Sequence, residues 1–97
     1  MATFMLLGTF TDQGLRAVKA TTKRAEEVRA LGKKMGVTVK DIYWTLGQHD
    51  VVVFVEAPDE TAAAALSLSV GALGNVRYQT IRAFTAAEAD KVLGRMA

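Results

Sequence analysis

Two segments of this 97-residue chain are strand-like and apolar on both faces. They are Phe4-Met5-Leu6-Leu7 and Val51-Val52-Val53-Phe54-Val55. A strand with one face in water alternates apolar and polar side chains, and neither segment does so. Each segment is therefore predicted to lie inside a sheet that is covered on both sides. Because the helices of so short a chain can cover only one face, we expect a second copy of the chain to cover the other.

Length and composition exclude several classes of protein. The chain is expected to form one domain over residues 1–97, and so small a domain is often marginally stable alone. The net charge of +2 does not indicate a nucleic-acid partner, and the absence of cysteine excludes a disulfide framework or a thiolate nucleophile. The N-terminus has no basic leader before an apolar stretch, and no apolar run approaches the roughly 20 residues of a membrane span. We therefore expect a cytoplasmic protein with no membrane partner.

The predicted elements follow the order β-α-β-β-α-β, with one further short helix. Strands are predicted at residues 3–10, 38–46, 51–57 and 76–84, and helices at 12–35, 58–73 and 86–93. Thr11 and Thr85 are N-cap candidates, and Glu88 completes a capping box with Thr85. This order predicts a ferredoxin-like α+β fold with a four-stranded antiparallel sheet, both main helices on one face, and a short C-terminal helix.

Periodicity assigns faces to two of these elements. In the second strand, strict alternation gives one face with Lys40, Ile42, Trp44 and Leu46, and another with Val39, Asp41, Tyr43 and Thr45. In the long helix, the residues at helical spacing that should pack on the sheet are Leu15, Val18, Thr22, Ala25, Val28, Leu31 and Met35.

Several motifs along the chain resemble those of the GYD domain family. They are Phe10-Thr11-Asp12-Gln13-Gly14, residues 38–47, the Gly-x-x-Asp of Gly47 to Asp50, Glu56-Ala57-Pro58-Asp59, and Leu73-Gly74-Asn75-Val76-Arg77. The resemblance covers essentially the whole chain, although the family's usual hairpin tyrosine is His49 here. It implies a dimeric α+β barrel, in which two sheets face each other, and it implies little about function.

The hairpin at residues 47–50 carries the main catalytic candidates. His49 is the only histidine, and histidine is the residue type best suited to move protons at neutral pH, so it is the candidate general base, with Asp50 to orient it. Tyr43 is the candidate donor to a developing oxyanion. The alternative reading, which we favour for the hairpin, is turn chemistry: Gly47 gives backbone freedom and Asp50 hydrogen-bonds the backbone of the turn.

Four residues are candidates for binding a small ligand: Tyr43, Trp44, His49 and Arg77. The alternatives are cross-strand aromatic packing for the first two and an edge-strand charge for the arginine. One histidine and no cysteine predict no metal site, and no glycine-rich phosphate loop is present, so no cofactor is expected. The basic residues of the first helix are interrupted by Glu26 and Glu27, and no RNA-binding strand signature is present, so no nucleic-acid partner is expected.

Three functions remain open. The first is a small homo-oligomeric domain that binds an organic ligand beside the sheet. The second is a cofactor-independent enzyme, an isomerase, lyase or monooxygenase acting on a small carbonyl or aromatic compound, and it rests on fold analogy alone. The third is a purely structural assembly module. The sequence does not establish whether there is catalysis.

Overall fold

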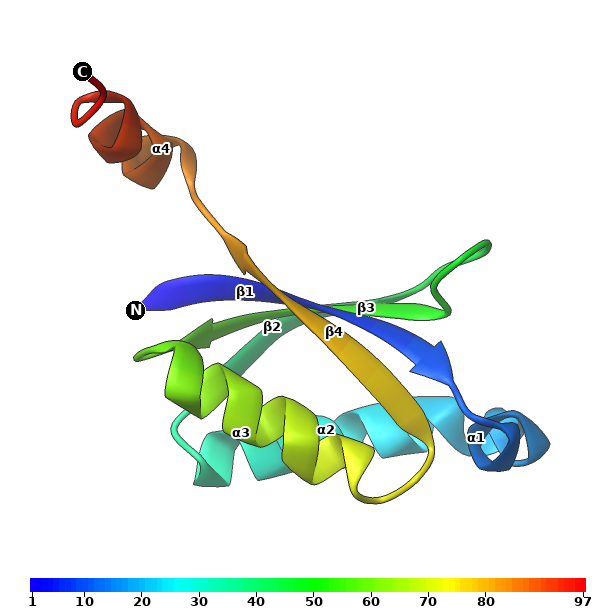
Figure 1. The fold of residues 1–97 in the computed structure, drawn as a ribbon. Coiled ribbons are helices and arrows are strands. Elements are labelled where there is room, and N and C mark those ends of the chain that lie inside the picture. The colour runs from blue at the N-terminus through cyan, green and yellow to red at the C-terminus, as the bar shows by residue number, and fades with distance from the viewer.

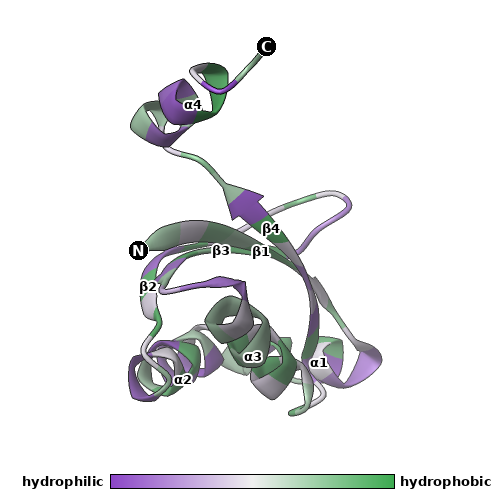
Figure 2. Ribbon diagram, turned by 60° about the vertical axis from the view of Figure 1, so that its left-hand side comes forward, coloured by the Kyte–Doolittle hydropathy of each residue, from purple (hydrophilic) through white to green (hydrophobic).

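The computed structural model describes residues 1–97, and its elements follow the predicted order (Figure 1). They are β1 (Ala2–Phe10), α1 (Asp12–Arg16), the 3-10 turn η1 (Val18–Ala20), α2 (Thr21–Lys34), β2 (Thr38–Trp44), β3 (Val51–Ala57), α3 (Glu60–Gly71), β4 (Val76–Ala83) and α4 (Ala86–Leu93). The sheet is antiparallel with the order β2-β3-β1-β4. Both α2 and α3 lie on one face, whereas α4 lies apart on the other side (Figure 2). The predicted α+β fold, with a four-stranded antiparallel sheet and helices, is confirmed.

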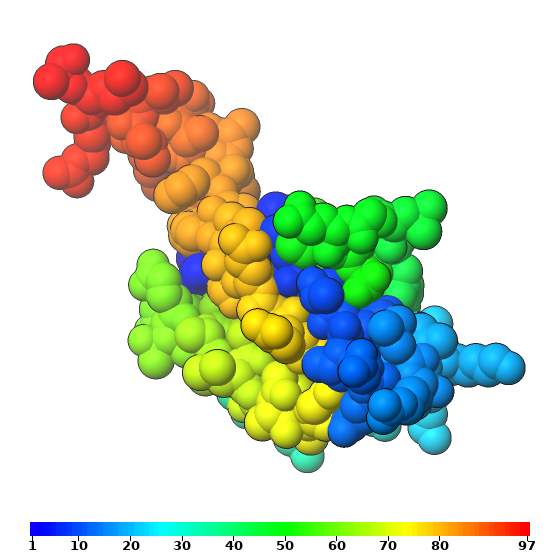
Figure 3. Space-filling view, turned by 45° about the vertical axis from the view of Figure 1, so that its right-hand side comes forward, coloured from blue at the N-terminus to red at the C-terminus, as the bar shows by residue number.

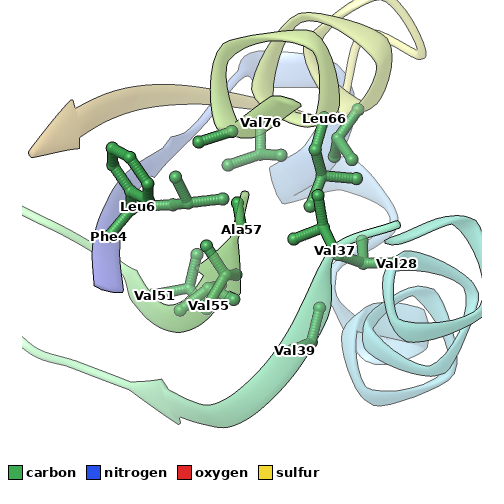
Figure 4. Close-up of a cluster of buried hydrophobic side chains, with 13 residues drawn as sticks. Phe4, Leu6, Val28, Val37, Val39, Val51, Val55, Ala57, Leu66 and Val76 are labelled. Carbon is green, nitrogen blue, oxygen red and sulfur yellow. The ribbon is translucent and has the colours of Figure 1, made fainter. Parts of the chain in front are cut away.

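The hydrophobic core lies between the sheet and the two long helices (Figure 4). In β1 and β3, alternate side chains such as Leu6, Val53 and Val55 point into this core and are completely buried. From α3, the core receives Leu66 and other small or medium apolar residues at helical spacing, which lets the helix lie close to the strands. Asp59 begins α3 because its carboxylate accepts a hydrogen bond from Ala62 N at 2.9 Å.

The predicted continuous helix over residues 12–35 was wrong. The helix is interrupted at Ala17, so a short α1 and the turn η1 precede α2. Leu15 and Val18 are exposed instead of packing on the sheet. Only the later part of the predicted apolar face reaches the core. Val28 is buried in the core, and the partly buried Leu31 packs against the core.

The break follows from contacts that hold α1 against the α3–β4 turn. The Thr11 hydroxyl donates to Gly74 O at 2.5 Å and accepts from Gly14 N at 3.1 Å. Gln13 Nε2 donates to Asn75 Oδ1 and to the carbonyl oxygen of Leu73, both at 3.0 Å. Two segments about sixty residues apart are therefore joined here, and α1 cannot share the axis of α2.

The predicted faces of β2 were partly wrong because the strand contains a β-bulge. Opposite β3, the pairing passes from Val39–Val55 directly to Asp41–Phe54, which leaves Lys40 as an extra residue. Val39 is therefore buried on the helix side, the same side as Ile42, whereas strict alternation placed them on opposite faces. Past the bulge the predicted pattern holds, with Asp41 and Tyr43 on the side away from the helices.

A pair of glycine substitutions tests the contact between α1 and the turn. A Cβ atom on Gly14 would lie 2.0 Å from Asn75 O, so Gly14→Ala should lower the free energy of unfolding by about 1–3 kcal/mol. A Cβ atom on Gly71 would meet nothing nearer than 3.8 Å, so Gly71→Ala should raise it by about 0.5–1 kcal/mol. Urea unfolding of both variants measures the two effects, and shifts of the same sign would contradict this packing.

Candidate functional site

The strand side chains that point away from α2 and α3 form one surface, here called the open face. They are Thr3, Met5, Leu7 and Thr9 of β1, Val52, Phe54 and Glu56 of β3, Asp41 and Tyr43 of β2, and Arg77, Gln79 and Ile81 of β4. The register places apolar side chains of the central strands β1 and β3 in the middle of this surface. No helix of the chain covers it (Figures 1 and 2).

The open face has an apolar centre, and an aromatic pair extends from this centre to the edge strand β2. The rings of Tyr43 and Phe54 meet edge to face, with centroids 6.4 Å apart, and Tyr43 is still 58% exposed. Towards one end, Lys40 Nζ lies 3.3 Å from Glu56 Oε1. Aromatic anchors surrounded by a polar rim are typical of protein–protein interfaces.

In the β2–β3 hairpin, Asp50 bonds to β1. Its Oδ2 accepts from Phe10 N at 2.9 Å, and its own N–H donates to Gly8 O at 2.8 Å. The neighbouring His49 is half-buried, and its Nδ1 is enclosed without a hydrogen-bond partner. The carboxylate of Asp50 is thus engaged with backbone and makes no hydrogen bond to the imidazole.

The candidate ligand-binding residues lie on different surfaces. Tyr43 and Arg77 both belong to the open face, but they come from opposite edge strands. Trp44 faces the helices, and its Nε1 donates to Thr21 Oγ1 at 3.0 Å, which ties the end of β2 to the start of α2. The structure therefore does not bring these side chains and His49 into one pocket.

A cavity of about 70 Å³ lies on the helix side of the sheet, under α2. Twelve of the sixteen residues around it are hydrophobic, so its walls are mainly apolar, and Trp44 and Tyr78 belong to them. This volume suffices for a few water molecules, whereas pockets for organic ligands usually measure about 300 Å³ or more. Of the four candidate ligand-binding residues, only Trp44 lines this cavity.

Tyr78 of β4 packs against the hydrophobic core. Burial raises its pKa to about 12. Its ring lies opposite Gly8 of β1, where a Cβ atom would be 2.9 Å from the ring, so the glycine makes room for it. The sequence gives no direct signal of this arrangement, because it depends on the register between β1 and β4.

Arg82 is a second residue whose surroundings the sequence did not reveal. Its guanidinium donates to Thr3 O at 3.2 Å and to Glu88 Oε2 at 3.0 Å, and it lies over the Phe4 and Phe84 rings. The predicted capping box of Thr85 and Glu88 is confirmed, and the backbone hydrogen bond from Thr85, followed by the bond from Arg82, lowers the pKa of Glu88 to about 2.

No three His, Asp or Glu side chains are grouped so that they could hold a metal ion. None of the helices combines the length and apolar character that crossing a bilayer would require.

The fold and these surfaces define a small α+β protein with a ferredoxin-like topology and one uncovered sheet face. The chain belongs to the GYD domain family, whose family model matches residues 4–93. It is 35% identical over 89 residues to a protein of Thermus thermophilus named glutamine synthetase and cystathionine beta-lyase binding protein. The match covers 91% of this chain and 94% of that protein. No solved structure gives a significant match.

Substitution of Asp50 should destabilise the protein more than substitution of His49. Asp50→Ala leaves the Phe10 N–H without its acceptor, which should cost about 1–3 kcal/mol. His49→Ala removes packing, but it also removes a ring nitrogen that is buried without a hydrogen-bond partner. Because such a nitrogen destabilises the fold, its removal offsets part of the stability lost with the packing. Chemical denaturation compares the two variants, with Asp50→Asn as a control that keeps an acceptor. A larger loss for His49→Ala would contradict these roles.

The Tyr78 pKa predicts how stability changes in alkali. The folded-state pKa of about 12 lies above the ordinary value of 10.0, so folding favours the protonated phenol. The contribution of this phenol to the free energy of unfolding is fully present below pH 10. It is lost as the pH rises to about 12, by at most about 1.4 kcal/mol per pH unit.

Because lysines also titrate in this range, the test compares variants at pH 9 and pH 11. Tyr78→Phe should lose less stability between these two pH values than the parent does. Tyr43→Phe, which removes an exposed tyrosine, should behave like the parent. Equal slopes for all three proteins would contradict the assignment.

Proposed function

We propose that this chain is a non-catalytic binding domain that works as a homodimer and docks onto larger proteins. In the dimer the open faces of two copies meet, as in a dimeric α+β barrel. The observation that carries the proposal is the apolar open face, which no helix of the chain covers.

The surface area supports a second copy as the cover. A compact folded protein of 10.4 kDa exposes about 5,400 Å², whereas this chain exposes 6411 Å². The difference of about 1,000 Å² resembles the roughly 800 Å² that each partner buries in a standard interface. The composition of the open face agrees, because Phe54 of the central strand β3 and Tyr43 of the edge strand β2 provide a pair of aromatic anchors.

The relative's name supports a role in contacting other proteins. That Thermus protein is named for binding glutamine synthetase and cystathionine beta-lyase, and it matches this chain over almost its whole length. We propose that the present chain likewise binds metabolic enzymes. With the open faces buried in the dimer, the outer surfaces of α2 and α3 stay available for such partners.

The small-ligand and enzyme hypotheses have less support from the geometry. The cavity under α2 is small, and His49, Tyr43, Trp44 and Arg77 do not converge on it. A general base at His49 would lack the orienting carboxylate, because Asp50 bonds to Phe10 N. The catalytic roles of His49, Asp50 and Tyr43, and the ligand-binding roles, stay predictions that a ligand-bound structure would test.

A charge placed on the open face tests the proposed dimer. Phe54→Lys puts an ammonium group in the centre of the apolar surface and should raise the dimer dissociation constant about thirty-fold or more. Leu68→Lys is the matched control, because Leu68 is also apolar and is 75% exposed, but it lies on α3 on the other side of the sheet.

Sedimentation velocity at micromolar concentration measures the mass of each protein. The parent and Leu68→Lys should sediment as dimers, and Phe54→Lys should sediment as a monomer. A monomeric parent, or a dimer that Phe54→Lys leaves intact, would contradict the proposal.

A further inference from the structure

Helix α4 exposes apolar side chains because it does not pack on the rest of the protein. It lies away from the rest of the molecule (Figure 3). Ala89, Val92 and Leu93 share one side of the helix, and the last two are 51% and 60% exposed. A helix of eight residues is too short to be stable alone in water, where about 12–15 residues are needed. Its apolar side is therefore open to contact with another molecule.

The base of α4 holds the helix outward instead of letting it fold back. Arg82 bonds to Thr3 O and Glu88 Oε2, and its guanidinium lies 4.5 Å from the centre of the Phe84 ring. Glu88 in turn accepts from Thr85 N at 3.0 Å. These contacts fix the direction of α4 relative to β1 and β4, so the helix is positioned to meet another molecule.

The β2–β3 hairpin is the counterpart of α4 at the other end of the sheet. In the strand register Ala83, at the end of β4, lies beside Thr3, whereas the hairpin joins β3 beside Gly8. Both α4 and the hairpin rise on the open-face side (Figures 1 and 2). The hairpin carries Leu46, which is completely exposed. The open face is thus bordered by one apolar projection at each end.

A two-fold axis between two open faces brings these projections together. In such an interface a contact from one copy to the other is always made twice. When the axis runs across the strands, it exchanges the ends of the sheet, so the α4 end of each copy faces the hairpin end of its partner. The chain is elongated enough for this, with a radius of gyration of 14.3 Å against about 12.5 Å for a compact domain of its length.

We propose that α4 of each protomer packs its apolar side, with Val92 and Leu93, against the β2–β3 hairpin of its partner around Leu46. This inference rests on the proposed homodimer. It assigns the helix to the dimer contact, and it makes Arg82 and Glu88 positioning residues that aim the helix at the partner. An axis parallel to the strands would instead place α4 against α4 and hairpin against hairpin.

Engineered cysteines distinguish these arrangements, because the chain has no cysteine of its own. Full-length Leu46→Cys and Leu93→Cys variants are mixed, allowed to exchange subunits, and oxidised mildly. Peptide mass spectrometry should then find the disulfide between positions 46 and 93 as the main product. Lys91→Cys, on another side of α4, is the matched control and should give several-fold less cross-link to position 46.

Each other outcome overturns the proposal in a recognisable way. A main product joining position 93 to position 93 would show that the helices meet each other. A dimer by sedimentation without cross-links from position 93 would show that α4 does not reach the partner, while the proposed dimer stands. A monomeric parent would overturn both proposals.

A double-mutant cycle avoids reliance on disulfide chemistry. Leu46 and Leu93 stand at opposite ends of one chain, so coupling between Leu46→Ala and Leu93→Ala in the dimer dissociation constant can only arise between chains. We expect each substitution to raise this constant about ten-fold and the double variant to raise it by clearly less than the product. Strictly multiplicative effects would contradict the contact.

Discussion

The sheet is apolar on both sides of its two central strands, and the chain supplies long helices for one side only. Leu6, Val53 and Val55 point into the core under α2 and α3, while Leu7, Val52 and Phe54 point the opposite way. The strand order β2-β3-β1-β4 keeps these apolar strands in the middle and places polar side chains such as Asp41 and Gln79 at the edges. Helix α4 and the β2–β3 hairpin project on the side of this uncovered face, whereas α2 and α3 lie on the other side of the sheet (Figures 1 and 2).

Much of the fold could be predicted because its signals are local. The apolar runs of β1 and β3, the Thr11 cap and the capping box of Thr85 and Glu88 each depend on neighbouring residues only. The break between α1 and α2 could not be predicted, because Leu15 and Val18 fit the helical period. It is decided instead by contacts with Gly74 and Asn75, about sixty residues further along the chain. The bulge at Lys40 was missed for the same reason, since it exists only in the pairing with β3.

The candidate site shows the same limit. Turn chemistry predicted that the Asp50 side chain bonds to the backbone of its own turn, and this was wrong: the carboxylate accepts from Phe10 N, which is forty residues away and belongs to another strand. Strict alternation placed Tyr43 on the face opposite Trp44, as the structure has them, yet it could not show that one face was filled by helices and the other empty. The roles of Arg82 and Tyr78 depend on β4 pairing with β1 and were not visible in the sequence.

Small-angle X-ray scattering of the unmodified chain in solution tests whether a second copy covers the open face. For a dimer, the forward scattering at micromolar to millimolar concentration should give twice the chain mass of 10.4 kDa. The radius of gyration should also lie clearly above the 14.3 Å of the single chain. A particle of 10.4 kDa with a radius of gyration near 14.3 Å throughout this range would contradict the proposed dimer.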